Sequence, residues 1–511
     1  MSAAKKSVGS KNGKVRARTG IFGLDEILLN GFPSGDLYLV EGDPGSGKTT
    51  LGLQFLLEGA RLGEKGLYVT LSESKHELLG VAESHEWSLK EIAIFEMTPE
   101  EEDIKPENQY TVFHPSDVEL ADTTDAVLKV VDKLQPSRVV LDSLSELRML
   151  ARDPLRYRRQ MLGLKRYFAG RNCTVLLLDD RTAERHDLQL QSIAHGVVMM
   201  HSLDREFGVT RRRLEVRKLR GSSFREGFHD YTIKTGGLVV YPRLVAAEHQ
   251  SESLHKPVRS GLEELDQLLG GGIDTGTSTL LMGPAGCGKS TIAIRYALSA
   301  AQRGSGAAIF TFDEVLPNLM RRAFGLGMPL EEHIKSGKLI VEQVDPAELS
   351  PGEFVERVRK LVREKTVGMI IIDSLNGFLN AMPGEQFLAL QLHEMLSYLD
   401  QQGVTTIMIL AQHGFVGSGM RTAVDVSYLA DSVILFRYFE SSGAMKKAIS
   451  VLKKRSGQHE RTIRELIFSN GHIEIGLPLS DFEGVLTGVP KYRGTAEELV
   501  TARGFKPTRT G

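Results

Sequence analysis

Gly42-Asp43-Pro44-Gly45-Ser46-Gly47-Lys48-Thr49 decides much of this protein's fold, and a matching stretch runs Gly283-Pro284-Ala285-Gly286-Cys287-Gly288-Lys289-Ser290. Both stretches fit the pattern G-x-x-x-x-G-K-[ST] of phosphate-binding loops. The glycines let consecutive backbone N–H groups turn toward a phosphate, the lysine reaches the β- and γ-phosphates, and the hydroxyl binds Mg²⁺. Because each loop follows an apolar run and precedes a helical stretch, we predict two nucleotide sites rather than one chance match.

The similarity between the two halves extends well beyond the loops. In chain order, the matching pairs are 19–25 and 260–266, 66–71 and 307–312, 138–143 and 369–374, and 174–178 and 405–410. The third pair is an all-apolar run ending in Asp-Ser, which is typical of a strand buried on both faces of a parallel sheet. Alternating strands and helices therefore predict an α/β fold in each half, with a mostly parallel sheet covered by helices on both faces.

This duplication predicts two domains, 15–245 and 256–486, each large enough to bury its own core. The rest of the predicted organisation is a basic disordered tail (1–14), a polar linker (246–255) and a C-terminal tail (487–511). A nucleic-acid-binding arm is the alternative interpretation of the first tail.

Composition narrows the protein class and its environment. The chain has 511 residues, of which 41% are hydrophobic, and a net charge of −2. No apolar run is long enough to span a bilayer, so no membrane partner is predicted. Two cysteines, Cys173 and Cys287, are too few for a disulfide framework and indicate a reducing cytoplasm.

An aspartate ends the third apolar run of each half, Asp142 in the first and Asp373 in the second. At the end of such a strand, an aspartate lies where Mg²⁺ is bound beside the phosphates. Together with the loop hydroxyls of Thr49 and Ser290, these aspartates are the predicted metal ligands.

A further carboxylate follows the strand after each loop. It is Glu73 in the first half and the pair Asp313-Glu314 in the second. Such a group is placed to orient or deprotonate the nucleophile that attacks a phosphate. The alternative is that Ser72 or Asp313 simply caps the helix that follows.

Each half also ends with a strand that carries alternate basic residues. Lys218 and Arg220 share one strand face in the first half, as Lys453 and Arg455 do in the second. Such a pair could reach a γ-phosphate on a neighbouring subunit, as an arginine finger does. The alternative is a solvated strand face.

Taken with these motifs, three longer stretches resemble the KaiC family of circadian-clock ATPases and autokinases, which have tandem RecA-like domains. They are R-x-R-T-G-I-x-G-L-D-E-I (16–27), L-x-V-x-K-L-R-G (214–221) and I-I-D-S-L (371–375), and the resemblance covers about 16–490. It implies two tandem RecA-like P-loop domains, a double-ring homohexamer with ATP and Mg²⁺ between subunits, slow ATP hydrolysis in the first ring and autophosphorylation in the second.

The resemblance also assigns the site residues. For the nucleotide these are Gly45, Ser46, Gly47, Lys48, Thr49, Thr50, Lys218, Leu219 and Arg220 in the first half, and Gly286, Cys287, Gly288, Lys289, Ser290, Thr291, Lys453 and Arg455 in the second. The basic residues at the ends of the two halves would act in trans. Ser427, Tyr428 and Thr422 align with the hydroxyl residues that the family phosphorylates.

Several positions depart from the family pattern. A pair of glutamates in the family's first domain is Ser72-Glu73 here, which leaves one carboxylate for hydrolysis in the first ring. Asp313 replaces the first glutamate of the second pair and is one methylene shorter. Tyr428 stands where the family has threonine.

Three functions remain open from the sequence: a hexameric ATPase and autokinase, an ATP-driven ring without kinase activity, and a RecA/DnaB-like nucleic-acid-dependent ATPase. The net charge does not favour nucleic acid as a partner. The resemblance implies a KaiB-like partner, whereas the C-terminal tail does not match the peptide that would recruit a KaiA-like one.

Overall fold

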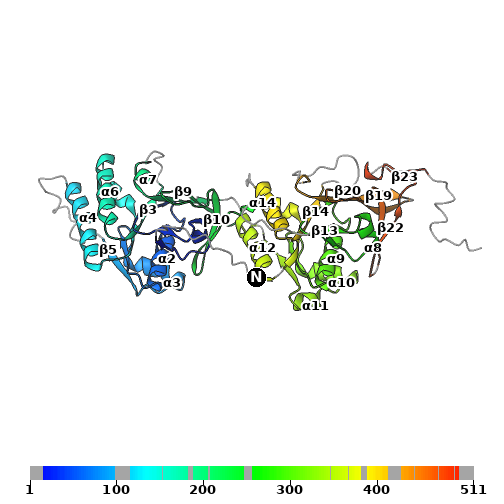
Figure 1. The fold of residues 1–511 in the computed structure, drawn as a ribbon, viewed down its shortest axis with the longest axis horizontal. Coiled ribbons are helices and arrows are strands. Elements are labelled where there is room, and N and C mark those ends of the chain that lie inside the picture. The colour runs from blue at the N-terminus through cyan, green and yellow to red at the C-terminus, as the bar shows by residue number, and fades with distance from the viewer. Residues whose placement is uncertain are drawn as a thin grey trace, which may run out of the picture. The chain divides into compact units, whose positions relative to one another are not determined.

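The protein is described from a computed structural model that covers residues 15–97, 115–151, 153–181, 188–204, 208–246, 256–345, 347–365, 367–380, 388–412, 427–441, 443–469, 471–487 and 490–493. The chain divides into two compact units, Met1–Arg243 and Leu244–Gly511, each described by itself (Figure 1). The predicted tail 1–14, most of the predicted linker (247–255) and the end of the predicted C-terminal tail (494–511) lie outside the described residues.

The first unit is built on a nine-stranded sheet in the order β11-β10-β9-β8-β3-β7-β6-β4-β5. Its strands are β3 (Leu37–Gly42), β4 (Gly66–Thr70), β5 (Ile92–Glu96), β6 (Arg138–Asp142), β7 (Thr174–Asp180), β8 (Gly196–Leu203), β9 (Arg211–Leu219), β10 (Phe228–Lys234) and β11 (Gly237–Tyr241), beside the short pair β1 (Arg16–Ala17) and β2 (Phe32–Pro33). Its helices are α1 (Leu24–Ile27), α2 (Lys48–Arg61), α3 (Lys75–Ser84), α4 (Pro115–Leu134), α5 (Leu144–Ala151), α6 (Pro154–Ala169) and α7 (Leu188–Ile193).

The second unit repeats this topology in a sheet of order β16-β15-β17-β18-β14-β19-β20-β21-β22. Its strands are β14 (Ser278–Gly283), β15 (Gly306–Thr311), β16 (Leu339–Gln343), β17 (Val367–Asp373), β18 (Thr405–Ala411), β19 (Ser432–Ser441), β20 (Ala444–Lys454), β21 (Arg464–Ser469) and β22 (His472–Pro478), with short strands β12 (Pro257–Val258), β13 (Ile273–Asp274), β23 (Phe482–Glu483) and β24 (Lys491–Tyr492). Its helices are α8 (Glu263–Leu268), α9 (Lys289–Gln302), α10 (Leu316–Gly325), α11 (Glu331–Lys335), α12 (Pro351–Lys365), α13 (Leu375–Asn380), α14 (Leu388–Gln401) and the 3-10 turn η3 (Val485–Thr487).

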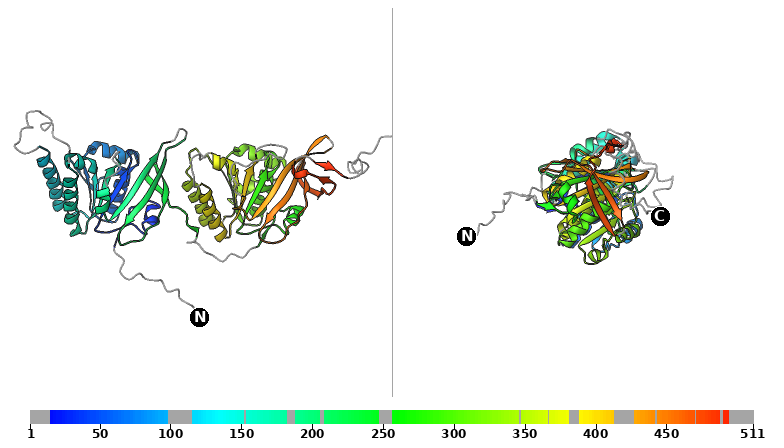
Figure 2. Two further views of the ribbon diagram at one scale, coloured as in Figure 1. Left: turned by 90° about the horizontal axis from the view of Figure 1, so that it is seen from above. Right: turned by 90° about the vertical axis from the view of Figure 1, so that its right-hand side faces the viewer.

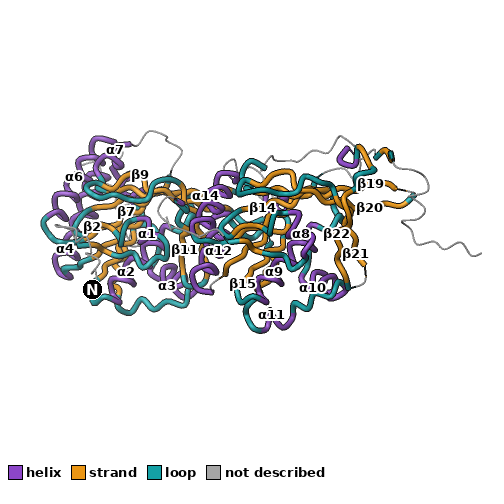
Figure 3. The backbone as a smooth tube through the Cα atoms, turned by 45° about the vertical axis from the view of Figure 1, so that its right-hand side comes forward, coloured by secondary structure: helices purple, strands orange, loops and turns teal. Residues whose placement is uncertain are grey.

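The central strands explain why both faces of each sheet are covered. Along β3, Tyr38 and Val40 belong to the core that α2 completes, whereas Leu37 and Leu39 belong to the core that α6 completes. Successive side chains of a strand point to opposite faces, so an all-apolar strand supplies two cores at once. Figure 2 and Figure 3 show helices on either side of each sheet. The predicted fold class, two mostly parallel sheets in tandem RecA-like P-loop units, is confirmed.

Each sheet also carries an antiparallel extension that the sequence analysis did not foresee in full. Strand β9 pairs antiparallel with β8 and β10, and β10 pairs with β11; β20, β21 and β22 repeat this arrangement. Only the basic strands β9 and β20 had been singled out. No helix within the described segments is both long and apolar enough to cross a membrane.

Acidification is expected to destabilise the first unit through His229 of β10. The buried ring accepts a hydrogen bond from the Arg243 N–H (2.8 Å) and donates one to the Arg225 carbonyl (3.1 Å). Burial, together with the charges of Arg225 and Arg243, lowers the pKa of His229 from 6.5 to about 4. The unfolded chain binds a proton at His229 more tightly than the folded chain does. The contribution of His229 to the free energy of unfolding is therefore complete above pH 6.5 and falls by about 3 kcal/mol toward pH 4.

The measurement is urea unfolding of the full chain at several pH values. The fluorescence of Trp87 reports the first unit, because the sequence contains a single tryptophan. The control is His229→Gln, whose side chain keeps one donor and one acceptor but does not titrate. An equally steep loss of stability between pH 6.5 and 4 in this variant would contradict the assignment to His229.

Candidate functional site

Both phosphate loops connect a central parallel strand to a long helix, β3 to α2 and β14 to α9. The last loop glycines, Gly47 (φ 94°) and Gly288 (φ 106°), adopt the left-handed conformation that precedes each helix. A Cβ atom at Gly47 would lie 2.6 Å from Ile233 of β10, and one at Gly288 would lie 2.3 Å from Phe468 of β21. The antiparallel extension therefore packs against the loop and leaves room only for glycine there, while the backbone N–H groups at the helix start suit an anion.

The two loop lysines have different surroundings. Lys48 Nζ donates to the carbonyls of Gly42 (2.9 Å) and Asp43 (3.0 Å) and forms an ion pair with Asp180 Oδ1 at 2.8 Å. Lys289 Nζ likewise donates to the carbonyls that end its strand and begin its loop, but its other neighbour is Cys287 Sγ at 3.7 Å. Burial lowers the pKa of Lys289.

The predicted metal ligands meet in both units. Thr49 Oγ1 donates to Asp142 Oδ2 at 3.0 Å, and in the second unit the Ser290 side chain is close enough to Asp373 to lower the pKa of that carboxyl group. Burial raises the pKa of both carboxyl groups, which a divalent cation would reverse. The peptide bond after each aspartate is cis. A hydroxyl and a carboxylate beside a phosphate loop fit Mg²⁺, which takes few protein oxygens and completes its shell with phosphate and water.

The carboxylates after β4 and β15 lie on matching turns. Thr70 Oγ1 donates to the Glu73 carbonyl (2.5 Å), and Thr311 Oγ1 donates to the Glu314 carbonyl (2.8 Å). The capping alternative is wrong, because α3 is capped by Ser74 in a reciprocal box with Glu77, and α10 has Val315 at its N-cap.

The two turns differ in what surrounds the carboxylate. Glu73 Oε2 is buried without a hydrogen-bond partner, and burial, followed by the charges of Asp142 and two other acidic residues, raises the pKa of Glu73. Glu314 is instead held by Arg322 through Nη2–Oε2 (2.5 Å) and Nε–Oε1 (3.3 Å) contacts. The sequence analysis missed Arg322, which is one of two adjacent arginines on α10.

The remaining carboxylate of the second pair faces a hydroxyl. Asp313 Oδ2 accepts a hydrogen bond from the Oγ of Ser374, the residue directly after the predicted metal ligand Asp373. The sequence analysis also missed Asp180, which lies two residues beyond the fourth apolar run. In the structure it ends β7 beside the phosphate loop.

The basic pairs at the ends of β9 and β20 bind main-chain carbonyls of their own unit. Lys218 Nζ donates to the Gln191 carbonyl at 2.6 Å, and Arg220 Nη2 donates to the Ser192 carbonyl at 2.9 Å. Burial lowers the pKa of Lys218. Lys218 is partly buried, whereas Arg220 is exposed.

The second unit has the same arrangement around the predicted phosphoacceptors. Lys453 Nζ donates to the carbonyls of Ala430 (2.7 Å) and Ser427 (3.3 Å), and Arg455 Nη2 donates to the Tyr428 carbonyl (3.0 Å). Tyr428 is 58% exposed and Ser427 is half-buried. Thr422 lies outside the described residues.

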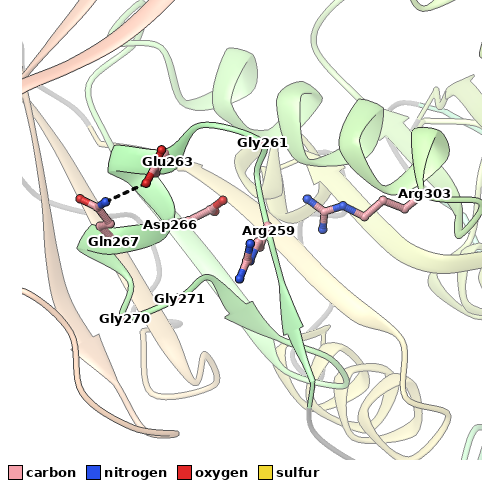
Figure 4. A pocket seen from close by; sticks show the side chains of 8 residues that line it. All are labelled: Arg259, Gly261, Glu263, Asp266, Gln267, Gly270, Gly271 and Arg303. Atoms are coloured by element: carbon pink, nitrogen blue, oxygen red, sulfur yellow. Dashed lines mark hydrogen bonds between the residues drawn. The ribbon is translucent and has the colours of Figure 1, made fainter.

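A separate pocket of about 790 Å³ lies at the other end of α9 from the phosphate loop. Figure 4 shows its lining residues, Arg259, Gly261, Glu263, Asp266, Gln267, Gly270, Gly271 and Arg303. Asp266 is already satisfied by Ser260, whose N–H and hydroxyl donate at 2.7 and 2.9 Å. None of the lining residues belongs to the phosphate loop, so this pocket is distinct from the candidate nucleotide site.

Comparison with known proteins shows which family this chain resembles. The family model described as "ATPase: KaiC" matches residues 17–245 and 258–480. A circadian clock oscillator protein KaiC from Acaryochloris marina is 26% identical over 502 residues (96% of this chain, 94% of the relative), and one from Synechococcus elongatus is 27% identical over 487 residues (93% and 92%). A circadian clock protein KaiC3 from Synechocystis is 27% identical over 496 residues (95% and 96%).

Proposed function

The chain belongs to the KaiC family of ATPases, and from this membership we propose that it forms an ATP-binding homohexameric double ring that hydrolyses ATP and phosphorylates Ser427 of its own second unit across the subunit interface. ATP would bind with Mg²⁺ at both phosphate loops. The trans-acting groups would be Lys218 and Arg220 in the first ring and Lys453 and Arg455 in the second.

The kinase proposal rests on the contacts that Lys453 and Arg455 make with the segment holding the predicted phosphoacceptors Ser427 and Tyr428. Lys453 and Arg455 bind the carbonyls of Ser427 and Tyr428, so a neighbour's nucleotide that meets these cations also meets the acceptor hydroxyl. In the first unit the corresponding carbonyls belong to Gln191 and Ser192. Phosphorylation is proposed for the second ring from the family resemblance, in which Ser427 aligns with a phosphorylated hydroxyl residue.

The transfer needs a base for the acceptor proton. Glu314 forms an ion pair with Arg322, whereas Asp313 has no cationic partner among its described contacts. We assign the base to Asp313. The Ser427 oxygen forms a bond to the γ-phosphorus, the bond from that phosphorus to the ADP oxygen breaks, and the hydroxyl proton passes to the Asp313 carboxylate.

Incubation with Mg-ATP is expected to place phosphate on Ser427. The measurement is intact-mass and phosphopeptide analysis of the purified chain after hours with Mg-ATP. The control is Asp313→Asn/Glu314→Gln, in which the base is lost while the phosphate loop is intact, so its phosphorylation should fall about 100-fold or more. Absence of phosphate from the second unit in every nucleotide state would contradict the kinase proposal.

One observation favours a second function, an ATP-driven ring that signals without kinase activity. Both second-unit carboxylates already have partners, Arg322 for Glu314 and Ser374 for Asp313. This function predicts steady ADP release with no covalent phosphate. In either case the proposed setting is cytoplasmic, with a KaiB-like protein as the candidate partner and no role assigned to a KaiA-like one.

A further inference from the structure

We propose that Asp180 is a catalytic carboxylate of the first nucleotide site, where it orients the water that attacks ATP. This inference rests on the ATPase function of the first unit. Asp180 would supply a carboxylate that this chain lacks at position 72, because Ser72 occupies a position where the family's first domain has a carboxylate.

The sheet places Asp180 at the reacting end of the nucleotide site. Strand β7 lies between β3, which leads into the phosphate loop, and β6, which ends at the metal ligand Asp142. In the parallel register, Asp180 is paired with Gly42, and Leu178 is paired with Asp142. The end of β7 therefore extends two residues beyond the metal aspartate, toward the side of the loop where the terminal phosphate of ATP lies.

The contact with Lys48 fixes the distance to substrate. Asp180 Oδ1 lies 2.8 Å from Lys48 Nζ, the group that binds the β- and γ-phosphates. A carboxylate in hydrogen-bond contact with that ammonium lies about two hydrogen-bond lengths from a γ-phosphate oxygen, which is the spacing that one bridging water fills. The Asp180 side chain is 36% exposed, so solvent reaches it.

Neighbouring groups show that this carboxylate belongs to the same electrostatic cluster as the other candidate groups. The charge of Asp180 contributes to the raised pKa of both Glu73 and Asp142. Ser145 Oγ lies 3.4 Å from Asp180 Oδ2 and holds the second carboxylate oxygen in place. Lys48 and Mg²⁺ would offset the repulsion between this cluster and the phosphate.

The second unit lacks this carboxylate. Ala411 of β18 takes the same register position, paired with Gly283 at the start of the loop. That unit has Asp313 and Glu314 after β15 instead. The first unit therefore has Glu73 after β4 and Asp180 at the end of β7, whereas the second unit has Asp313 and Glu314 together after β15.

In the proposed step, the water oxygen forms a bond to the γ-phosphorus as the bond to the ADP oxygen breaks. The water proton passes to Asp180 and then to phosphate or solvent, so ATP and water give ADP, phosphate and a proton. No other reactant is required. A competing role is that Asp180 only neutralises Lys48, in which case its removal would strengthen ATP binding without slowing turnover.

The experiment uses the full chain with Lys289→Ala, so that ADP release reports the first unit. We expect Asp180→Asn in this background to lower ADP release about 100-fold while affinity for a fluorescent ATP analogue is unchanged or higher. Adding Ser72→Glu, which returns a carboxylate to the family position, should restore part of the rate. Unchanged turnover with tighter binding would overturn the inference.

The outcomes separate this inference from the proposed function. A Lys289→Ala parent that releases no ADP contradicts hydrolysis in the first unit, and the role of Asp180 falls with it. An active parent whose Asp180→Asn derivative is equally active contradicts only the role of Asp180. A slow derivative that binds the analogue normally and is rescued by Ser72→Glu supports the role, because a merely misfolded loop would not bind nucleotide.

Discussion

Lys48→Ala is expected to reduce ATP turnover in the first unit by about 100- to 1,000-fold, since it removes a preorganised cation from the transferring phosphoryl group. The side chain is 8% exposed and donates to the carbonyls of Gly42 and Asp43, so its position is fixed before nucleotide arrives. The affinity for ATP should fall as well, by about 10- to 100-fold, because a charge-assisted hydrogen bond is lost.

The matched change is Lys289→Ala, which should silence the second unit and leave the first active. Each variant is tested for ADP release and for binding stoichiometry with a fluorescent ATP analogue. Lys90→Ala, at an exposed position of the first unit, serves as the surface control. Two nucleotides bound per chain with wild-type affinity in either loop variant would contradict the assignment of these loops as nucleotide sites.

Features that depend on short stretches of sequence could be predicted from the sequence alone. The loops, the all-apolar strands and the aspartates that end them follow from short-range pattern, and the structure contains each of them. The N-cap of α3 also follows from a local signature, because Ser74 and Glu77 fit the S-x-x-E pattern of a capping box.

Other features depend on contacts between residues far apart in the chain. Asp180 and Lys48 meet only because β7 inserts beside β3, an arrangement that the order of strands along the chain does not reveal. Arg322 and Arg321 are adjacent on α10, and the orientation of that helix decides which one reaches Glu314. The antiparallel extensions have mixed polar and apolar strands, which carry a weaker signal than the central ones.

Arg220→Ala is expected to lower turnover in the first unit about 1,000-fold or more if the arginine acts as a finger on a neighbouring subunit. The side chain is exposed and its guanidinium is positioned by the Ser192 carbonyl, while Lys218 beside it is held by Gln191. Both groups are therefore presented at one edge of the unit. Arg217→Ala is the matched control, because Arg217 lies on β9 three residues before Arg220, is exposed and pairs with Glu215.

Mixing two inactive variants then decides whether Arg220 acts in trans. In a Lys289→Ala background, Lys48→Ala retains Arg220, and Arg220→Ala retains Lys48. In the proposed hexamer, reassembly from equal amounts creates interfaces that join an intact loop to an intact arginine, and random assembly gives about a quarter of all interfaces this composition. ADP release should therefore recover to about a quarter of the parental rate. If Arg220 acted on its own subunit's nucleotide, no interface would be repaired and the mixture would stay as inactive as its components.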